Sequence, residues 1–192
     1  MSNHQKRIEA MIVELKDTSE MMIDLAYLAL LYGNVEVAKQ VLELEEEMDD
    51  LHTTFELAVL ELKGRRPSKG ILGLIRLGLA AENFSDAATL IAEAVVKGVK
   101  PHPVFKMALE EAEETVLATR LADNSNLVNK NLGEIGLEDD LGMRIICVRQ
   151  EKKWIYNPKD NFVLRAGDTI IVRGYSEGKE KLLLLVNPNK TD

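Results

Sequence analysis

Cysteine and long apolar runs are nearly absent from this chain. Cys147 is the only cysteine, which excludes an internal disulfide and favours a reducing compartment. Its place in an apolar segment predicts a packed thiol rather than a nucleophile. The longest uncharged stretch, residues 25–35, is shorter than the roughly 18 residues that a membrane-spanning helix requires. The first residues contain no apolar run of signal-peptide length, so the sequence predicts neither a membrane span nor a secretory signal.

Two patterns that identify common cofactor and enzyme sites are also missing. No G-x-G-x-x-G follows a predicted strand, so a dinucleotide-binding domain of that kind is not expected. No arrangement of serine, histidine and acid indicates nucleophilic catalysis. His52 lies near carboxylates, but the pattern is too general to assign it as a base. The sequence therefore predicts a protein that is not an enzyme.

A surplus of basic residues is absent as well. The net charge is −8, and residues 1–122 carry all of it, because residues 123–192 hold equal numbers of acidic and basic side chains. A phosphate array needs a basic face on its partner. We therefore expect no nucleic-acid partner and no direct insertion into a membrane. An acidic first half suits cations instead.

Residues 5–122 have the apolar spacing of helices almost throughout. Glycine and proline clusters divide them into four segments, at about 4–32, 35–63, 70–98 and 102–121. In the first three segments, apolar residues recur at helical spacing and form one stripe on each helix. The short connections predict antiparallel neighbours in a helical bundle. The polar cluster at 123–126 marks its end, so the predicted domains are residues 1–123 and 124–192.

The remaining residues change to the spacing of strands. Apolar strands are expected near 143–150, 153–156 and 169–174, with a short helix near 131–140 and a last helix near 177–186. A sheet with one apolar face covered by helices predicts a small α+β sandwich. The predicted fold class is therefore an antiparallel helical bundle followed by an α+β domain. The small domains, together with the apolar segment 21–31, whose only charge is Asp24, favour a homodimer.

The second half resembles a known ligand-sensing domain. The pattern runs through residues 127–137 (LVNKNLGEIGL), 143–149 (MRIICVR), 157–158 (NP) and 164–174 (LRAGDTIIVRG). These segments resemble the C-terminal domain of the TrkA/RCK family, cytoplasmic regulators of potassium channels and transporters. The sequence departs from the family pattern at 129–131, where Asn-Lys-Asn replaces glycine-lysine-threonine. It departs again at Cys147, where a small residue is usual.

This resemblance implies where a ligand would bind. Ligands of the family bind where two copies of the domain meet, and the positions that match that cleft are Ile146, Arg149, Asn157 and Pro158. An arginine can bind a phosphate through two donors, and an asparagine can bind a base edge. The ligand classes that the family implies are nucleotides, cyclic dinucleotides and cations. The alternative that Arg149 ends a strand in solvent stays open.

Three predicted helices each carry two carboxylates four residues apart. The pairs are Glu20 with Asp24, Glu45 with Asp49, and Glu82 with Asp86. Residues four apart project from one face of a helix, where two like charges repel unless a cation or an arginine lies between them. Carboxylate clusters without cysteine suit divalent cations or iron. Solvated faces of acidic helices are the simpler alternative.

The third of these helices carries a second resemblance. Residues 77–88 (LGLAAENFSDAA) are similar to a helix of the PhoU proteins, helical bundles that bind metal clusters through Glu/Asp-x-x-x-Asp pairs and serve in phosphate regulation. The resemblance covers about 8–120 and implies that Glu82 and Asp86 are metal ligands. The counterparts on the earlier helices are Glu20, Asp24, Glu45 and Asp49.

The sequence departs from the PhoU pattern in two ways. Ala87 replaces the histidine that often follows the aspartate, and Asn83-Phe84 replaces arginine-isoleucine. The helical part is also about half of a PhoU protein, which implies that two chains supply the two halves.

Together the two resemblances imply regulation rather than catalysis. We predict a cytoplasmic regulatory subunit or ligand-sensing accessory protein of potassium or other cation transport. It would act as a homodimer and reach the membrane through a channel or transporter subunit. The alternative is a PhoU-type metal-binding adaptor in phosphate signalling. A third class of function, an enzyme with a carboxylate-bound metal, is less favoured by the sequence.

Overall fold

The computed structural model describes residues 3–62, 69–110, 112–151 and 153–189. The chain divides into two compact units, Met1–Pro101 and His102–Asp192. The first unit is helical, and the second combines helices with a small antiparallel sheet. The predicted fold class is therefore confirmed. In the described ranges, no helix combines the length and apolarity needed to cross a bilayer.

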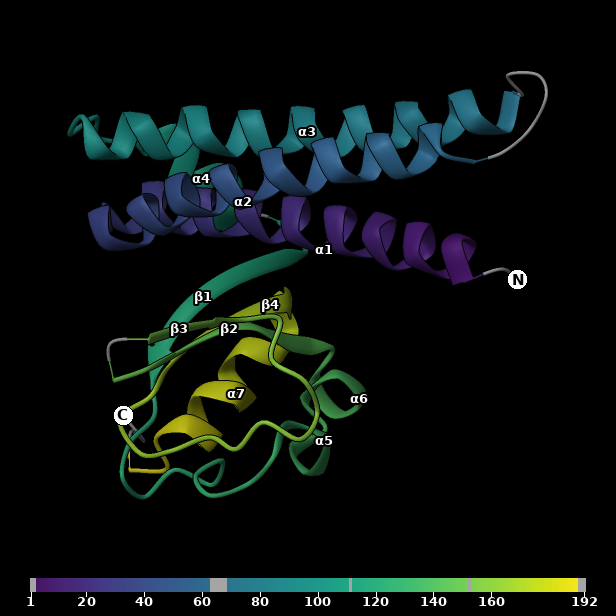
Figure 1. Ribbon diagram of the computed structural model, residues 1–192. Coiled ribbons are helices and arrows are strands. Elements are labelled where there is room, and N and C mark those ends of the chain that lie inside the picture. Colours follow the sequence, from purple (N-terminus) through teal and green to yellow (C-terminus); the bar gives the residue numbers. More distant parts are fainter. Residues whose placement is uncertain (1–2, 63–68, 111, 152, 190–192) are drawn as a thin grey trace. The chain divides into compact units, whose positions relative to one another are not determined.

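Three long helices form the first unit (Figure 1). They are α1 (Asn3–Tyr32), α2 (Val35–Leu60) and α3 (Lys69–Val96), close to the predicted segments 4–32, 35–63 and 70–98. Residue 63 lies outside the described residues. Asn34 begins α2, because its side chain accepts hydrogen bonds from the backbone N–H groups of Glu36 and Val37 at 3.1 Å.

Helices α1 and α2 supply most of the large core side chains of this unit. Phe55 on α2 is fully buried, as is Met22 on α1. The apolar segment 21–31, which we expected to favour a dimer partner, also contributes Leu25 and Leu28 to this core. Its apolar character is therefore satisfied mainly within the unit, so this segment gives little support for the homodimer, which stays a prediction.

Gly78 allows α3 to approach α2 closely. A Cβ atom at Gly78 would lie 2.8 Å from Cε1 of Phe55 and 3.3 Å from Cδ2 of His52. Because the ring of Phe55 is fully buried in a packed core, it has no space into which to move. The absence of a side chain at Gly78 thus places the polar residues around His52 directly beside α3.

The second unit is built on a four-stranded antiparallel sheet (Figure 1). The strands are β1 (Glu114–Arg120), β2 (Met143–Gln150), β3 (Lys153–Tyr156) and β4 (Thr169–Tyr175), in the order β1-β4-β2-β3. The helices are α4 (Pro103–Glu110), α5 (Leu132–Ile135), α6 (Leu137–Leu141) and α7 (Lys179–Val186), the last preceded by the short 3-10 helix η1 (Ser176–Gly178). Leu182 and Val186 of α7 share one apolar core with Val148, Ile170 and Val172 of the sheet.

One predicted helix is wrong in its second half. We expected a helix over 102–121, but Glu114–Arg120 is β1, which pairs with β4 from Glu114↔Tyr175 to Arg120↔Thr169. The strand buries Leu117 in the core of the second unit. Consequently the second unit begins at His102, before the boundary that we predicted at residue 123.

The other predicted elements of the second unit are confirmed with small changes. The predicted strands 143–150 and 153–156 match β2 and β3, and 169–174 lies within β4. The helix predicted over 131–140 is interrupted at Gly136, whose φ of 59° lies in the left-handed region that glycine adopts easily. The result is two short helices, α5 and α6.

Candidate functional sites

Two of the three predicted carboxylate pairs meet between α2 and α3. Glu45 and Asp49 belong to α2, and Glu82 and Asp86 belong to α3. Burial, a side-chain hydrogen bond with Asp49, and the charges of Asp49, Asp86 and Glu45 together raise the pKa of Glu82 to about 7. Burial, with the charges of Asp49, Asp86 and Glu46, also raises the pKa of Glu45. We call these four residues (Glu45, Asp49, Glu82 and Asp86) the α2–α3 carboxylate cluster.

His52 joins this cluster from α2. Its Nδ1 atom is 3.3 Å from Oε2 of Glu82, and its Nε2 atom is 3.7 Å from Oε1 of Glu56. Only 14% of the His52 side chain and 18% of the Glu82 side chain are exposed, so these contacts are little screened by water. Helical spacing places Glu45 and His52 on the same side of α2, which could have indicated His52 as a neighbour of the cluster. The contact between His52 and Glu82 also depends on α3 lying beside α2.

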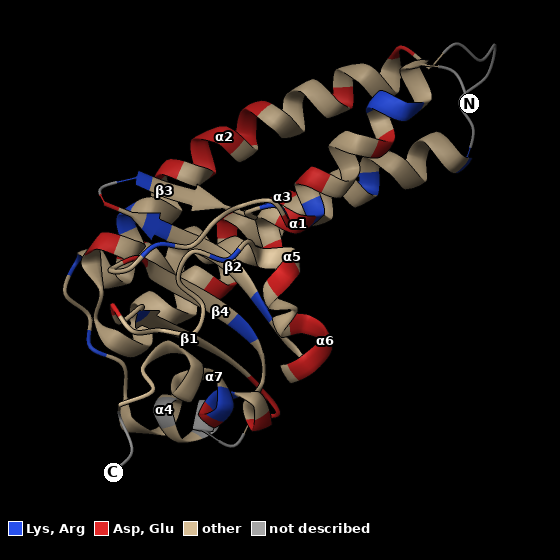
Figure 2. Cartoon of the chain, turned by 90° about the horizontal axis from the view of Figure 1, so that it is seen from below, with Lys and Arg blue, Asp and Glu red and all other residues tan. Residues whose placement is uncertain are grey.

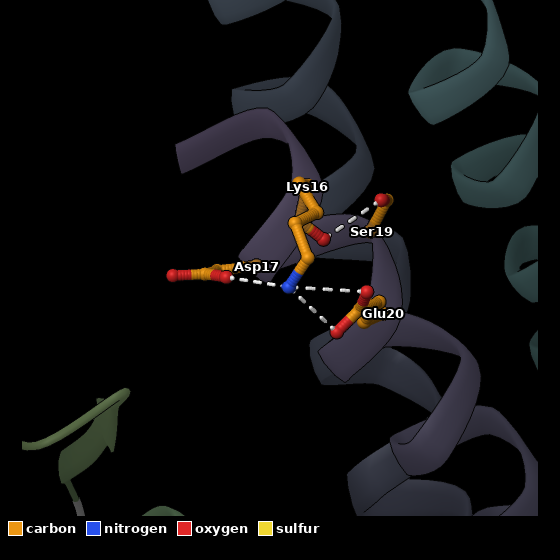
Figure 3. Close-up of polar contacts among 4 residues, drawn as sticks. All are labelled: Lys16, Asp17, Ser19 and Glu20. Atoms are coloured by element: carbon orange, nitrogen blue, oxygen red, sulfur yellow. Dashed lines mark hydrogen bonds and ion pairs between the residues drawn. The ribbon is translucent and has the colours of Figure 1, made fainter. Parts of the chain in front are cut away.

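The third predicted pair has a different environment on α1. Lys16 Nζ lies 3.2 Å from Oδ1 of Asp17 and 3.2 Å from Oε1 of Glu20 (Figure 3). Figure 3 also shows the hydroxyl of Ser19, which donates to the backbone oxygen of Lys16. Hydrogen bonds from Lys16 to Asp17 and Glu20 raise the pKa of Lys16. The neighbours that raise the pKa values of Glu45 and Glu82 lie on α2 and α3, and Glu20 and Asp24 of α1 are not among them.

Metal binding by these pairs stays a prediction. Within the residues that the structure describes, no group of three or more His, Cys, Asp and Glu side chains is arranged to hold a metal ion. All six predicted ligands lie in the described ranges. Burial and the neighbouring carboxylates favour the protonated form of Glu82.

In the second unit, arginines lie on the face of the sheet opposite the α7 core. In the strand register, Arg144 pairs with Arg173, while Arg149 and Arg120 both pair with Thr169 from opposite sides. Side chains alternate along strands, so these residues project away from the core residues of the same strands. We call Arg120, Arg144, Arg149 and Arg173 the arginine face. Figure 2 shows basic segments in blue on β2 and β4.

Sequence reasoning found only one member of the arginine face. Arg149 was identified through the family resemblance, whereas Arg120, Arg144 and Arg173 were not. They lie on three strands that are far apart in the sequence, and the register between strands decides which of them share a face. The alternation of Arg with apolar residues within β2 and β4 was the signal that could have indicated them.

Three of the predicted ligand-binding residues come together at one end of the β2–β3 pair. Ile146 is the extra residue of a β-bulge, since the pairing with β4 shifts between Ile145 and Cys147. Its backbone oxygen accepts a hydrogen bond of 2.9 Å from the backbone N–H of Asn157. Asn157 has a φ of 42°, a conformation that asparagine tolerates better than most residues. Pro158 follows directly and is half-buried.

The fourth predicted residue, Arg149, lies farther along β2. The carbon of its guanidinium group is 5.6 Å from the centroid of the Trp154 ring, and Trp154 is its cross-strand neighbour on β3. This distance is within the range of a cation–π contact. Arg149 is half-buried, so the arginine is held against an aromatic ring rather than extended into solvent.

Cys147 is the packed thiol that we predicted. It is fully buried in β2, and burial is the main cause that raises the pKa of the thiol to about 12. A thiol with such a pKa carries almost no thiolate at neutral pH and is a poor nucleophile. Its role in this part of the sheet is therefore packing.

Two domain families match this chain. The model of the PhoU domain matches residues 12–95, and the model of the TrkA-C domain matches residues 116–186. Each match lies within one of the two compact units. Both are domains of regulatory type. The TrkA-C match begins within β1, which agrees with the place of this strand in the second unit.

One relative among known proteins is similar over part of the chain. A segment of 88 residues is 31% identical to the Probable potassium channel protein 2 of Methanocaldococcus jannaschii. The match covers 45% of this chain and 26% of the relative. The chain thus spans about a quarter of the length of this relative.

Solved structures match this chain at low sequence identity. The RCK_C domain dimer of S. agalactiae BusR in complex with c-di-AMP is 22% identical over 38% of this chain and 97% of that chain, with a TM-score of 0.36. S. agalactiae BusR in complex with its busAB-promotor DNA is 14% identical over 100% of both chains, with a TM-score of 0.38. Similarity at this level carries no conclusion about ligands, and the predicted absence of a nucleic-acid partner stays a prediction.

Proposed function

We propose that the chain is a non-enzymatic regulatory or ligand-sensing accessory protein of cation transport. In this proposal its TrkA-C domain binds an anionic ligand at the arginine face. The observation that carries the proposal is Arg149, which is held against Trp154 on a face that also bears Arg120, Arg144 and Arg173. The sequence similarity to a probable potassium channel protein supports the link to potassium transport.

The chemistry of the arginine face favours a ligand with phosphate groups. A guanidinium group binds a phosphate through two parallel hydrogen bonds, and Arg149 is oriented in advance by the Trp154 ring. Arg144 and Arg173 lie directly opposite each other on neighbouring strands. A phosphate bound between them would contact both guanidinium groups. Nucleotides and cyclic dinucleotides are the ligand classes that fit.

The remaining predicted residues would complete such a site. Ile146, Asn157 and Pro158 lie together at one end of the same strand pair, where the amide of Asn157 would bind a base edge. We propose that the ligand contacts these residues from two copies of the domain in a homodimer. Ligand binding would then change how the two copies pack, and a cytoplasmic channel or transporter subunit would respond to that change.

Calorimetry on the full chain tests this proposal. Titration with cyclic di-adenosine monophosphate, ATP and NADH should show binding of at least one of them. Arg149→Ala should weaken that binding by about 1.5–3 kcal/mol, the range for a hydrogen bond to a charged group. This corresponds to roughly a tenfold loss of affinity or more. Arg149→Lys should recover only part of it, because lysine keeps the charge but lacks the planar fork.

A matched control distinguishes binding at the arginine face from a general effect of positive charge on affinity. Lys179 is exposed on α7, the helix that packs on the other face of the sheet. Lys179→Ala removes one positive charge from the same domain and should leave affinity unchanged. Equal affinities in the wild type and both Arg149 variants would place the ligand elsewhere, and no binding of any of the three compounds would contradict a nucleotide ligand.

The alternative function, a PhoU-type metal-binding adaptor in phosphate signalling, is favoured by one observation. The α2–α3 carboxylate cluster brings four carboxyl groups from two helices together. A bound divalent cation or iron would stabilise the folded state by mass action, so the double variant Glu82→Gln, Asp86→Asn should then melt at a lower temperature. Metal analysis of the purified protein, together with this melt, distinguishes the adaptor from the ligand sensor.

A further inference from the structure

Helix α3 has an unusual distribution of large and small residues. The residues that it buries are mostly small, and they are Gly78, Ala81, Ser85, Ala88, Ala92 and Val95. Its larger apolar side chains are exposed instead: Leu77 and Phe84 each have 57% of their surface exposed, and Leu90 has 70%. A helix that only served its own bundle would bury the large residues, because they gain most from leaving water.

Some of these exposed residues belong to a regular stripe. Steps of four and three residues alternate along α3 through Gly73, Leu77, Ala80, Phe84, Ala87, Ile91 and Ala94. We call these seven residues the α3 stripe. Spacing of this kind is the seam of a coiled coil, and here large and small residues alternate along it. The stripe runs beside the buried face of α3 and is exposed or half-buried along its whole length.

We propose that the α3 stripe packs antiparallel against the α3 stripe of a second copy of this chain. In an antiparallel pair, Phe84 would face Ala80 of the second copy, Leu77 would face Ala87, and Ile91 would face Gly73. Each of these three layers combines a large residue with a small one, which lets the helices approach closely and fill the interface. A parallel pair would instead stack Phe84 on Phe84 and alanine on alanine.

The stripe is therefore complementary to itself, which identifies a second copy as its partner. The charges beside it favour the same arrangement. Arg76 lies near one end of α3, so antiparallel pairing keeps it away from Arg76 of the second copy. Parallel pairing would place Arg76 beside Arg76 of the second copy, where like charges repel. This interface involves no ligand and does not depend on the function proposed for the arginine face.

Cysteine cross-linking in the full chain tests the proposed pairing. Asn83 is exposed beside the centre of the stripe, so antiparallel pairing places the two Asn83 residues across from each other. Asn83→Cys should form a covalent dimer under mild oxidation. Arg76→Cys should not, because in this register the two copies of residue 76 are roughly 18 Å apart along the helix axis, and a disulfide needs Cα atoms within about 7 Å. Native Cys147 is buried and has a raised pKa, so it does not compete.

Substitutions on the stripe provide the second arm of the test. In the Asn83→Cys background, Phe84→Glu and Ala80→Glu should each reduce cross-linking at least tenfold. Leu57 on α2 has 58% of its surface exposed, nearly the same as Phe84, so Leu57→Glu is the matched control and should leave cross-linking unchanged. All changed positions are exposed, and circular dichroism should show an unchanged helix content in each variant.

Three results would overturn the proposal. The first is no covalent dimer from Asn83→Cys, which would mean that the stripe is covered by something other than a second copy. The second is equal cross-linking of Arg76→Cys and Asn83→Cys, which would indicate parallel pairing. The third is cross-linking that the two glutamate substitutions on the stripe do not reduce.

Discussion

The carboxyl group of Glu82 meets more titratable neighbours than a surface glutamate would. Asp49 and Glu45 face it from α2, together with His52, and Asp86 shares its own helix. Because these surroundings raise its pKa from 4.5 to about 7, the folded state holds a proton that the unfolded state releases at lower pH. The stability from this proton is fully present below about pH 4.5 and is lost as the pH rises through about 7.

This linkage makes a prediction for Glu82→Gln. Glutamine keeps the shape of the protonated side chain but has no proton to lose. We expect the variant to be more stable than the wild type at pH 8, by a free energy of unfolding on the order of 1–3 kcal/mol, since each pKa unit corresponds to about 1.4 kcal/mol. At pH 4 the two proteins should have nearly equal stability. Urea unfolding at both pH values measures the difference.

Glu20 supplies the control for this experiment. It is also a helical glutamate with a carboxylate four residues away, but it has Lys16 at 3.2 Å. Glu20→Gln removes a favourable ion pair on an exposed surface and should cost less than about 1 kcal/mol at pH 8. If Glu82→Gln also lost stability at pH 8, the carboxyl of Glu82 would be paired with a cation, and the repulsive cluster described above would be wrong.

Gly78 and Gly73 form a second comparison at the residue scale. Both lie within α3, where replacing glycine with alanine normally stabilises a helix by about 1 kcal/mol. Gly73→Ala should follow this rule, because nothing lies within 4 Å of the added Cβ. Gly78→Ala should instead destabilise the protein by about 1–2 kcal/mol net, because its Cβ would lie 2.8 Å from the buried Phe55 ring. Thermal melts of the two variants should shift in opposite directions.

These residues also show which contacts could be predicted from the sequence and which could not. Helical spacing correctly placed Glu45 with Asp49 and Glu82 with Asp86, because one helix fixes which of its own residues share a face. The meeting of the two pairs with His52 depends on how α2 lies against α3, and that packing depends on the single missing side chain at Gly78. This contact depends on the tertiary structure, which a local sequence pattern does not specify.

At the scale of elements, β1 was the strand that sequence reasoning missed. No glycine or proline interrupts the chain between Pro103 and Asp123, so the sequence predicted one helix over 102–121. The segment is nevertheless rich in β-branched residues, with Thr115 and Thr119 on either side, and these favour a strand. Its partner β4 begins 49 residues after β1 ends, at Thr169, so no local hairpin signal indicated the pairing.

The place of β1 predicts how fragments of the chain behave. A fragment of residues 102–192 contains all four strands, whereas a fragment of residues 124–192 follows the boundary that the sequence suggested and lacks β1. The shorter fragment loses Leu117 and Leu121 from the core and exposes the edge of β4, which favours aggregation. We expect cooperative unfolding from the longer fragment only. Light scattering and thermal melts compare the two, and equal behaviour would mean that β1 is dispensable to the domain.

At the scale of the whole molecule, the sequence correctly predicted two domains of different character. The change from helical to strand-like spacing was visible because each period extends over many residues. Both family resemblances were confirmed by the domain matches. The charge is also divided between the domains: the helices carry the acidic excess, while the sheet presents the arginine face. The composition of the second half concealed this face, because its acidic residues equal its lysines and arginines in number but do not share their positions.

The strand order β1-β4-β2-β3 has a consequence for the protein as it leaves the ribosome. The three helices of the first unit can pack as soon as residue 96 has emerged from the ribosome, because they follow one another in the chain. The sheet must wait, since β4 lies between β1 and β2 and is the last strand to be made. Until Tyr175 emerges, β1 and the β2–β3 hairpin have no strand to join them. The TrkA-C domain therefore folds only after β4 has emerged, when the PhoU domain is already folded.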